Sequence, residues 1–507
     1  MLLMIRNKSF GASRSLITVS DTPIFGIDKI ENEIQMLNRK ATIHKWKSPT
    51  GEVLELVIPP TVYPPREDTD LMAKAIMKLG PGKNRNCLEI GCGSGVLSMF
   101  SSRQGWNVTA CDINPFAVAS TRGVAEDNQV DLEVHEGGPS PQIDGELLQW
   151  TGGKSFDLLF WNLPYLRYDK TQPETLGPME EAALLDTDNS GLIEHALNLI
   201  NRGLLNDSGI ALFIISNNET GLNAKSKCYS KGLAVRTISK LDLDDGEQLQ
   251  VIAVWKPYVN SDKIVIPVID STNLKLLESD LKVGSSICSP KQISGHGRRG
   301  RAWINSKRSF AGSWKLFDTK SSQEPGILQI IAGLCVKEAI SSSIFGFNNN
   351  DVIIKWPNDV MIKFDDKWKK VCGILVESRT VGKSSTIVVG IGINFSGDEN
   401  EYQFPIGFLE NYSKVFTFDK TRNLLDAILS SYFENNEKII GTNKDDLKQL
   451  LFTEIKLSFN SLGIPLYRNK RVELSKLCQD GKIEVIDEEM NSYIVDDGES
   501  IIWDSVN

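Results

Sequence analysis

Between residues 86 and 256 the chain alternates short apolar runs with stretches in which apolar residues recur every three or four positions. The apolar runs have the length of buried strands, and the stretches between them have helical periodicity. Such alternation is typical of an α/β domain whose sheet is largely parallel. Strands are expected at 87–90, 107–112, 156–161, 210–216 and 249–255.

A polar, proline-containing stretch at 256–263 predicts the end of this first domain. A second mixed region follows, and its apolar runs at 352–354, 371–378 and 386–396 predict further strands. Near the C-terminus, short β-rich pieces are split by turn signals at 479–482 and 496–499, which favours a small β-barrel. Residues 28–38 look like one short helix that lacks the second helix of a helix-turn-helix. The expected organisation is an N-terminal extension at 1–54, then domains at 55–257, 264–455 and 456–507.

The 507 residues carry 56 Lys and Arg against 65 Asp and Glu, a net charge of −9. Such a chain is not drawn as a whole to nucleic acid or anionic lipid, so phosphate binding has to be local. No apolar run approaches the ~20 residues of a membrane span, which argues against an integral membrane protein. Eight cysteines without a CxxC pair favour a reducing compartment, and four histidines make a His-rich zinc site a poor candidate. We therefore expect a cytoplasmic protein, with mitochondrial import as the alternative because the basic, serine-rich first 20 residues resemble a transit peptide.

Three glycines at 91, 93 and 95 follow the first predicted strand and precede a helical run. Glycine lets the backbone turn sharply and approach a ligand, and the helix beyond presents free N–H groups. A dinucleotide fingerprint needs its third glycine five positions after the first, where this chain has Val96. The spacing argues against NAD or FAD, whereas Asp112 at the next strand end is suited to accept hydrogen bonds from ribose hydroxyls.

The sequence Asn162-Leu163-Pro164-Tyr165 follows directly on the strand at 156–161, at the sheet edge where α/β folds bind ligands. Methylation of an amide or amine nitrogen requires the nitrogen lone pair to point at the methyl donor. The side-chain oxygen of Asn162 can accept an N–H of such a group, Pro164 stiffens the turn and Tyr165 can pack on a planar substrate. The simpler alternative is a proline turn after a buried strand.

Together, Glu89–Gly95, Asp112 and residues 162–165 resemble class I S-adenosylmethionine-dependent methyltransferases, which implies a Rossmann-like fold over roughly 55–257. The segment VYPPREDTD at 62–70 makes the resemblance closest to the HemK-like release-factor glutamine methyltransferases. By this resemblance the S-adenosylmethionine-binding residues are Thr69, Glu89, Gly91, Gly93, Asp112 and Asn162, the last also catalytic. The methyl acceptor is then held by Asn162, Pro164 and Tyr165.

The same resemblance implies a class 1 translation release factor and a small zinc-binding activator protein as partners. Leu163 replaces the first proline of the family's usual Asn-Pro-Pro-Tyr, which puts the acceptor in question more than the donor. Related motifs methylate adenine amino groups in nucleic acid, and an inactive domain that acts as a tether is a further alternative. Neither a membrane nor a specific DNA partner is expected.

A second cluster lies at 292–303, QISGHGRRGRAW, and residues 291–301 carry a charge of +4 without an acid. Interleaved glycines let the backbone fold around an anion while guanidinium groups bind its phosphate or carboxylate. Further on, the strand at 352–354 runs into Lys355, and Asn358-Asp359 follow after a proline. These two residues either form a simple turn or hold a magnesium–nucleotide complex beside the basic loop. Glycines 390 and 392 within a predicted strand indicate that another group packs closely against its backbone.

These segments resemble the biotin–protein ligase family over about 264–507. The resemblance implies an α+β catalytic domain followed by a small SH3-like β-barrel. It implies that ATP and Mg²⁺ activate biotin, which passes to a lysine of a biotin carboxyl carrier domain. The implied biotin-binding residues are Ser271, Thr272, Asn273, Gln292, His296, Gly297, Arg298 and Lys370. The implied ATP-binding residues are Arg298, Arg299, Arg301, Trp303, Lys355, Asn358, Asp359 and Asn394, with Asp359 as the metal ligand and Arg298 and Lys370 as catalytic groups. His296 stands where an arginine is more usual, which removes one permanent positive charge.

The residue types fit this chemistry. A carboxylate that attacks the α-phosphate of ATP meets another anion, so cationic side chains and a metal ion lower the repulsion. A glycine loop that orders over the labile biotinyl-adenylate excludes water. Lipoate is the alternative substrate, although lipoate ligases lack the arginine-rich loop, and a biotin-sensing repressor would need a DNA-reading helix pair. The sequence therefore predicts a bifunctional enzyme, an N-methyltransferase fused to a biotin–[acetyl-CoA-carboxylase] ligase.

Overall fold

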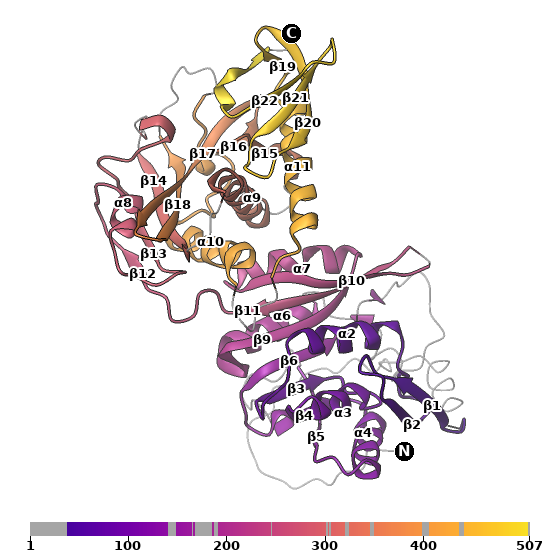
Figure 1. Ribbon diagram of the computed structural model, residues 1–507. Coiled ribbons are helices and arrows are strands. Elements are labelled where there is room, and N and C mark those ends of the chain that lie inside the picture. The colour runs from indigo at the N-terminus through magenta and orange to yellow at the C-terminus, as the bar shows by residue number, and fades with distance from the viewer. Residues whose placement is uncertain are drawn as a thin grey trace, which may run out of the picture.

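The computed structural model describes residues 38–139, 149–164, 166–167, 185–186, 191–244, 246–300, 303, 306–319, 324–344, 349–397, 405–435 and 441–504. The described chain forms an N-terminal part, residues 38–258, and a C-terminal part from residue 263 onward, stacked end to end (Figure 1). The short helix expected at 28–38 falls almost entirely outside the described residues, as do Tyr165 and Arg301.

The N-terminal part is built on a seven-stranded sheet with the order β10-β11-β9-β6-β3-β4-β5. Strands β9, β6, β3, β4 and β5 pair in parallel, and β11 and β10 add to the edge in antiparallel fashion. The largely parallel sheet is thus confirmed, with β5 and β10 as two strands that the hydrophobic pattern did not indicate. The strands are β3 Asn86–Ile90, β4 Asn107–Asp112, β5 Glu133–Glu136, β6 Phe156–Asn162, β9 Leu205–Ser216, β10 Ala234–Asp242 and β11 Gln248–Trp255.

Helices and a hairpin cover this sheet. The helices are α2 Glu67–Lys78, α3 Val96–Arg103, α4 Pro115–Asp127, α6 Leu192–Leu199 and α7 Glu219–Ser230. The hairpin of β1 Thr42–Lys47 and β2 Val53–Ile58 buries Trp46, Leu54 and Leu56 in the same apolar cluster as Met72 of α2. The domain start expected at residue 55 therefore falls inside β2. Two residue pairs, β7 Leu166–Arg167 and β8 Leu185–Asp186, form a separate short ladder.

The C-terminal part contains a second seven-stranded sheet with the order β12-β13-β14-β18-β17-β16-β15. Only the β12–β13 pair is parallel among these described strands. The strands are β12 Lys263–Val265, β13 Ser286–Ser289, β14 Arg308–Thr319, β15 Val352–Lys355, β16 Asp359–Phe364, β17 Lys367–Val381 and β18 Ser384–Ser396. The helices are α8 Thr272–Leu277, α9 Pro325–Ser343, α10 Phe418–Phe433 and α11 Lys444–Ser461.

Helix α9 packs across this sheet, and most of its buried residues are apolar. Within the described residues it is the one helix long and apolar enough to cross a membrane by length and composition alone. Of its apolar window, 67 % is buried inside the protein, as in a core helix of a folded domain.

The last five strands form an antiparallel sheet with the order β22-β21-β20-β19-β23. They are β19 Ile464–Tyr467, β20 Lys470–Leu477, β21 Ile483–Asp487, β22 Ser492–Val495 and β23 Ile501–Asp504. The boundary expected at 455/456 falls inside α11, so this sheet begins after the helix. The turn between β22 and β23 reaches the β15–β16 hairpin, where a Cβ on Gly498 would lie 2.6 Å from the Trp356 carbonyl oxygen.

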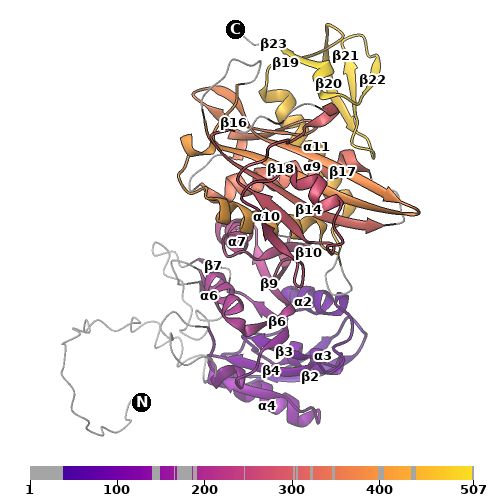
Figure 2. The same cartoon turned by 90° about the vertical axis from the view of Figure 1, so that its left-hand side faces the viewer.

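The two parts meet where α7 and the edge strand β10 lie against α9 and α10, in both views of the molecule (Figures 1 and 2). One apolar cluster runs across the junction and includes Val235 of β10, Cys335 of α9 and Ile428 of α10. The backbone N–H of Val235, on the outer edge of the sheet, donates to the Ser431 hydroxyl at 2.9 Å. An exposed strand edge is an aggregation hazard, and here α10 covers it.

Arg236 holds this junction together. It is 5 % exposed and donates through Nε to the carbonyl of Ser431 at 2.8 Å and through Nη2 to that of Glu434 at 2.9 Å. These are carbonyls at the C-terminus of α10, which lack partners within the helix. A positive charge at this end also complements the helix dipole. Burial lowers the pKa of Arg236 to about 10, so the guanidinium stays charged at neutral pH.

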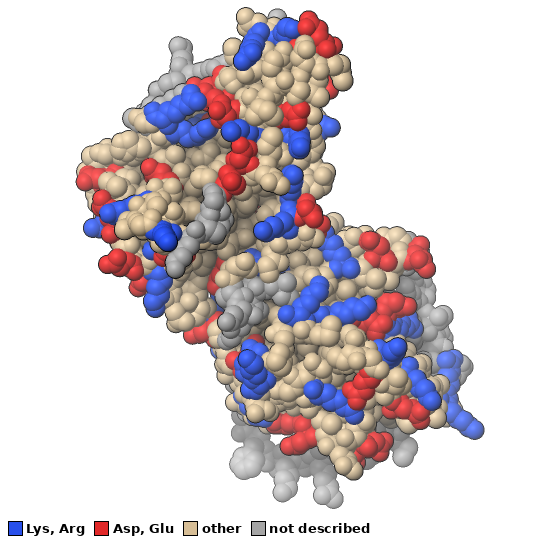
Figure 3. Space-filling view, in the orientation of Figure 1, with Lys and Arg blue, Asp and Glu red and all other residues tan. Residues whose placement is uncertain are grey.

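Acidic and basic side chains are interspersed over the face of the molecule shown in Figure 3. This face has no broad surface of a single charge, in agreement with local rather than whole-chain attraction of anions.

Candidate active sites

The first pocket lies at the carboxyl edge of the N-terminal sheet. Its described lining includes Thr69, Glu89, Gly91, Gly93, Asp112, Asn162, Leu163 and Pro164. Strand β3 lies between β6 and β4, and the chain leaves β3 to one side before returning through β6 on the other. Such a switch point leaves a crevice beyond the strand ends, where α/β sheets bind ligands. All the residues predicted for the methyl donor therefore line one cavity.

The glycine loop between β3 and α3 adopts the conformation that its sequence demands. Gly91, Gly93 and Gly95 have φ values of 70°, 51° and 77°, in the left-handed region that favours glycine. A Cβ on Gly95 would lie 2.9 Å from Thr121 of α4, so a side chain has no room there. The backbone N–H of Gly93 donates to Asp112 Oδ2 at 2.9 Å, which joins the loop to the end of β4.

Two of the carboxyl groups that line this pocket, those of Glu89 and Asp112, have different surroundings. Glu89 is 4 % exposed, and burial raises its pKa to about 8, although the Ser98 hydroxyl donates to it and opposes the shift. Burial also raises the pKa of Asp112, against hydrogen bonds from the backbone N–H groups of Asn114 and Gly93. At neutral pH the carboxyl group of Glu89 is thus mostly protonated. Asp112, at the end of β4, is more exposed to solvent than Glu89.

Asn162 ends β6 at the same edge, and its Nδ2 donates to Asp68 Oδ2 at 2.8 Å. Leu163, which departs from the family motif, is 5 % exposed and packs in the apolar cluster while it also lines the pocket. Asp68 lies within the 62–70 segment, but no role was predicted for it from the sequence. Tyr165 lies outside the described residues, so its predicted contact with the acceptor stays a prediction.

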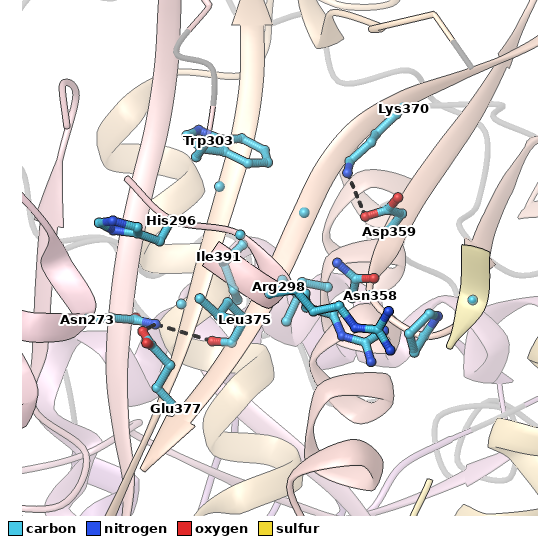
Figure 4. A pocket seen from close by; sticks show the side chains of 18 of the residues that line it. Asn273, His296, Arg298, Trp303, Asn358, Asp359, Lys370, Leu375, Glu377 and Ile391 are labelled. Carbon is cyan, nitrogen blue, oxygen red and sulfur yellow. Dashed lines mark hydrogen bonds and ion pairs between the residues drawn. The ribbon is translucent and has the colours of Figure 1, made fainter. Parts of the chain in front are cut away.

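The second pocket crosses the C-terminal sheet and has a polar end and a cationic end (Figure 4). At the polar end, the backbone N–H of Thr272 donates to Gln292 Oε1 at 2.8 Å. Asn273 Nδ2 donates to Glu377 Oε2 at 2.7 Å, and the Ser313 hydroxyl donates to Asn273 Oδ1 at 2.6 Å. The strand β18 leaves space for this side chain, since a Cβ on Gly390 would lie 2.3 Å from Asn273 Oδ1.

At the cationic end, Lys370 Nζ lies 2.7 Å from Asp359 Oδ1, and Lys355, Asn358 and Arg298 complete the lining. Asp359 and Lys355 pair at the ends of β15 and β16, so Trp356, Pro357 and Asn358 form the hairpin loop between the two strands. Arg298 is half-buried, and burial lowers its pKa, while the negative charge of Asp497 opposes the shift. Cationic side chains thus line this end of the pocket together with the Asp359 carboxylate.

Glycines of β17 and β18 line the floor of this pocket. A Cβ on Gly373 of β17 or Gly392 of β18 would lie 2.6 Å from the indole ring of Trp303. The backbone N–H of Trp303 donates to the Gly295 carbonyl at 2.8 Å, which closes the base of the arginine-rich loop. The prediction that another group packs on the glycines at 390 and 392 is confirmed, with Asn273 on one and Trp303 on the other.

The lining also contains acidic residues to which the sequence assigned no role. The turn after β22 contributes Asp497, whose Oδ2 lies 2.7 Å from Nη1 of Arg299. Glu377 lines the same pocket, from β17. Asn394, predicted to bind ATP, is 4 % exposed and does not belong to the described lining, so a direct contact with the nucleotide is not supported. Arg301 lies outside the described residues.

Two family models match the chain. Residues 65–183 match the methyltransferase small domain, and residues 265–394 match the biotin/lipoate A/B protein ligase family. One model thus matches within the N-terminal part of the chain and the other within the C-terminal part. The N-terminal part, called the methyltransferase domain below after the model it matches, holds the first pocket, and the C-terminal part, called the ligase domain, holds the second.

Individual relatives match one domain each. The ligase domain is 33 % identical over 131 residues to a biotin–[acetyl-CoA-carboxylase] ligase of Paracoccus denitrificans, a match that covers 25 % of this chain and 52 % of that protein. The methyltransferase domain is 29 % identical over 143 residues to a release factor glutamine methyltransferase of Lactococcus lactis, covering 27 % of this chain and 50 % of that protein. The chain therefore spans about half the length of these curated relatives.

Among solved structures, a biotin protein ligase from Aquifex aeolicus in complex with biotin and ATP aligns with a TM-score of 0.37 and 23 % identity. The alignment covers 48 % of this chain and 99 % of that chain.

Proposed function

We propose that the ligase domain activates biotin with ATP and transfers it to a lysine of a biotin carboxyl carrier domain. The observation that carries the proposal is the division of the second pocket into an amide-rich end and a cationic end joined by a glycine floor. Thr272, Asn273 and Gln292 offer donors and acceptors to a ureido ring, and Lys370, Lys355 and Arg298 face the place where two anions must meet.

In this proposal a biotin carboxylate oxygen attacks the α-phosphorus of ATP, and the bond to pyrophosphate breaks. Lys370 and Arg298 offset the negative charge that gathers at the phosphorus. The arginine-rich loop, anchored by Trp303 on the glycine floor, then keeps water from the mixed anhydride. The carrier lysine attacks the acyl carbon, and AMP leaves.

Mg²⁺ fits the residues present. Magnesium proteins often supply one or two carboxylates and leave the other positions to water and substrate phosphates. Asp359 provides one carboxylate at the cationic end, beside the amide of Asn358. Asp359 would hold the ion, which when bound supplies charge neutralisation at the phosphates.

The proposal is tested with the variant Arg298→Gly of the full chain. We expect biotinyl-adenylate to appear in solution, because the loop no longer retains it, while wild type keeps it bound. Arg379→Gly, at an exposed position of β17, is the matched control and should behave as wild type. Retention of the adenylate by Arg298→Gly would show that the loop does not have this role. If the protein formed lipoyl-adenylate and no biotinyl-adenylate, the substrate would be lipoate and not biotin.

We propose that the methyltransferase domain transfers a methyl group from S-adenosylmethionine to a glutamine amide nitrogen of a protein, of the release-factor type. The glycine loop and Asp112 support the donor, and the pocket's residues Thr69, Glu89 and Asn162 surround the same space. S-adenosylmethionine, when bound, supplies the activated methyl group. Asn162 would accept an N–H of the acceptor through Oδ1 and so aim the nitrogen lone pair.

The affinity for S-adenosylmethionine tests this second proposal. Isothermal titration of wild type should show binding, and Asp112→Ala should weaken it by about 10-fold or more because a ribose contact is lost. Absence of binding to either chain would favour an inactive domain that acts as a tether.

The proposal also covers the partners of the protein, the role of the C-terminal sheet and the cellular location. The partners are the carrier domain, a class 1 release factor and a small zinc-binding activator protein, and neither a membrane nor specific DNA is included. The C-terminal sheet would serve as the small SH3-like barrel of the ligase, and the location would be the cytoplasm. Fractionation of cells and capture of partners with the full chain test these points.

A further inference from the structure

Asp68 lies in the first turn of α2 and is 3 % exposed. Its two carboxylate oxygens accept hydrogen bonds from different residues. Oδ1 accepts the backbone N–H of Thr69 at 2.6 Å and its hydroxyl at 3.2 Å, while Oδ2 accepts the Asn162 side-chain amide at 2.8 Å. The residue thus ties the 62–70 segment to the end of β6, although 94 positions separate the partners in the sequence.

This contact determines the orientation of the Asn162 side-chain amide. A carboxylate carries no hydrogen and only accepts, so the NH₂ side of the amide must face Asp68. The carbonyl side then faces the opposite way. Asn162 Oδ1 is shielded from solvent and has no hydrogen-bond partner among the described residues, and its residue lines the first pocket. A buried acceptor without a partner is costly unless a ligand satisfies it.

We propose that Asp68 is a positioning residue that locks the Asn162 amide so that Oδ1 is offered to an N–H of the methyl acceptor. The inference rests on the proposed methyl transfer to nitrogen. It narrows the acceptor to a nitrogen that carries a hydrogen to donate as well as a lone pair to be methylated, as in a primary amide or amine. An acceptor atom without hydrogen leaves Oδ1 unpaired.

The test uses the full chain with the near-isosteric variant Asp68→Asn. Its side-chain oxygen still accepts the Thr69 N–H, but its NH₂ group competes for the Asn162 carbonyl and permits the amide to turn over. The matched control is Asp70→Asn on the same helix, where the carboxylate accepts the Trp46 indole N–H outside the pocket. Affinity for S-adenosylmethionine by titration, and kcat and KM for a glutamine-containing acceptor protein, are measured on each variant and on Asn162→Ala.

We expect Asp68→Asn to lower kcat by about 10–100-fold, as misplacement of an orienting group does, and to leave the donor affinity within about twofold. Asp70→Asn should match wild type. Adding Asp68→Asn to Asn162→Ala should cost nothing further, because Asp68 acts through Asn162. A merely structural role would instead give additive losses and a lower melting temperature. Unchanged kcat in Asp68→Asn, or additive effects, would overturn the proposal.

A second measurement does not depend on the acceptor. In wild type the Asn162 side-chain NH₂ signal, assigned by its loss in Asn162→Ala, should be protected from solvent exchange in a ¹⁵N NMR spectrum. The protection should disappear in Asp68→Asn. Rapid exchange in wild type would overturn the lock itself. A protected amide in a chain that methylates no acceptor would support the lock while refuting the proposed function.

Discussion

Glu89 illustrates how a single side chain couples the first pocket to the stability of the fold. The residue stands on the inner strand β3, where neighbouring strands and α3 exclude water from it. Burial raises its pKa from 4.5 to about 8, so the folded chain holds a proton that the unfolded chain releases. The folded state therefore loses stability as the pH rises from about 4.5 to about 8, and loses no more above that.

Glu89→Gln removes the titrating proton and should remove this loss. The melting temperature of the variant relative to wild type should rise steadily between pH 5 and pH 8, with a slope in free energy of up to about 1.4 kcal/mol per pH unit. Calorimetry of both chains at several pH values measures this. Glu55→Gln, at an exposed site on β2, is the control and should not change the slope. If the melting temperatures of Glu89→Gln and wild type changed in parallel with pH, Glu89 would not be protonated in the folded state.

At this scale the sequence predicted the side chains that belong to local motifs. Thr272, Gln292, Lys370 and Arg298 all line one pocket, since short motifs carry the spacing that places them. It did not predict Ser313, which a strand 40 residues away brings to Asn273. Neither Asp68 nor Asp497 was assigned a role, because each acts through a partner distant in the sequence. Asn394 was predicted to bind ATP because it lies in a motif, but it is buried and does not belong to the described lining of the second pocket.

At the scale of elements, the glycine floor formed by β17 and β18 determines where the arginine-rich loop is anchored. Trp303 lies against two strands at positions where any side chain would displace it. The glycines in the sequence predicted a close approach but not its partner, because the loop returns to the sheet from far away in the chain. Strand β5 was missed because it has four residues and little apolar character, and β10 because its outer half is polar.

Gly392→Ala should push Trp303 from this floor. The added methyl group would lie 2.6 Å from the indole ring, and overpacking of this kind costs about 1–3 kcal/mol. We expect KM for biotin to rise about 10-fold or more, measured by adenylate formation. Gly123→Ala in α4, where a Cβ meets no neighbour, is the control and should leave KM unchanged. An unaltered KM for Gly392→Ala would mean that Trp303 does not shape the second pocket.

At the scale of the whole molecule, the junction is built like a protein interior. Trp255 Nε1 donates to the Ser430 hydroxyl at 3.0 Å, and the backbone N–H of Tyr258 donates to Glu434 Oε2 at 2.9 Å. The segment at 256–263, predicted as a polar boundary, therefore begins with residues that belong to the junction. Nothing in its composition indicated this, because the partners lie on α10, more than 170 residues further along.

Arg236→Ala should weaken this junction. The change leaves carbonyls at the end of α10 buried without donors, which costs about 2–4 kcal/mol. We expect a lower melting temperature and, in calorimetry, a wider separation between unfolding of the two parts. Arg379→Ala, at an exposed site, should change neither. A melting profile of Arg236→Ala identical to that of wild type would show that the junction adds little to stability.

The most direct test of the central claim, that the cationic second pocket joins biotin to ATP, is the intact mass of a biotin carboxyl carrier domain. The domain is incubated with the full chain and ATP, and with either biotin or lipoate. The account predicts that the carrier gains the mass of one biotinyl group on a lysine, that lipoate adds nothing, and that omission of ATP prevents the gain. An unmodified carrier in the presence of biotin, or a carrier modified by lipoate alone, would contradict it.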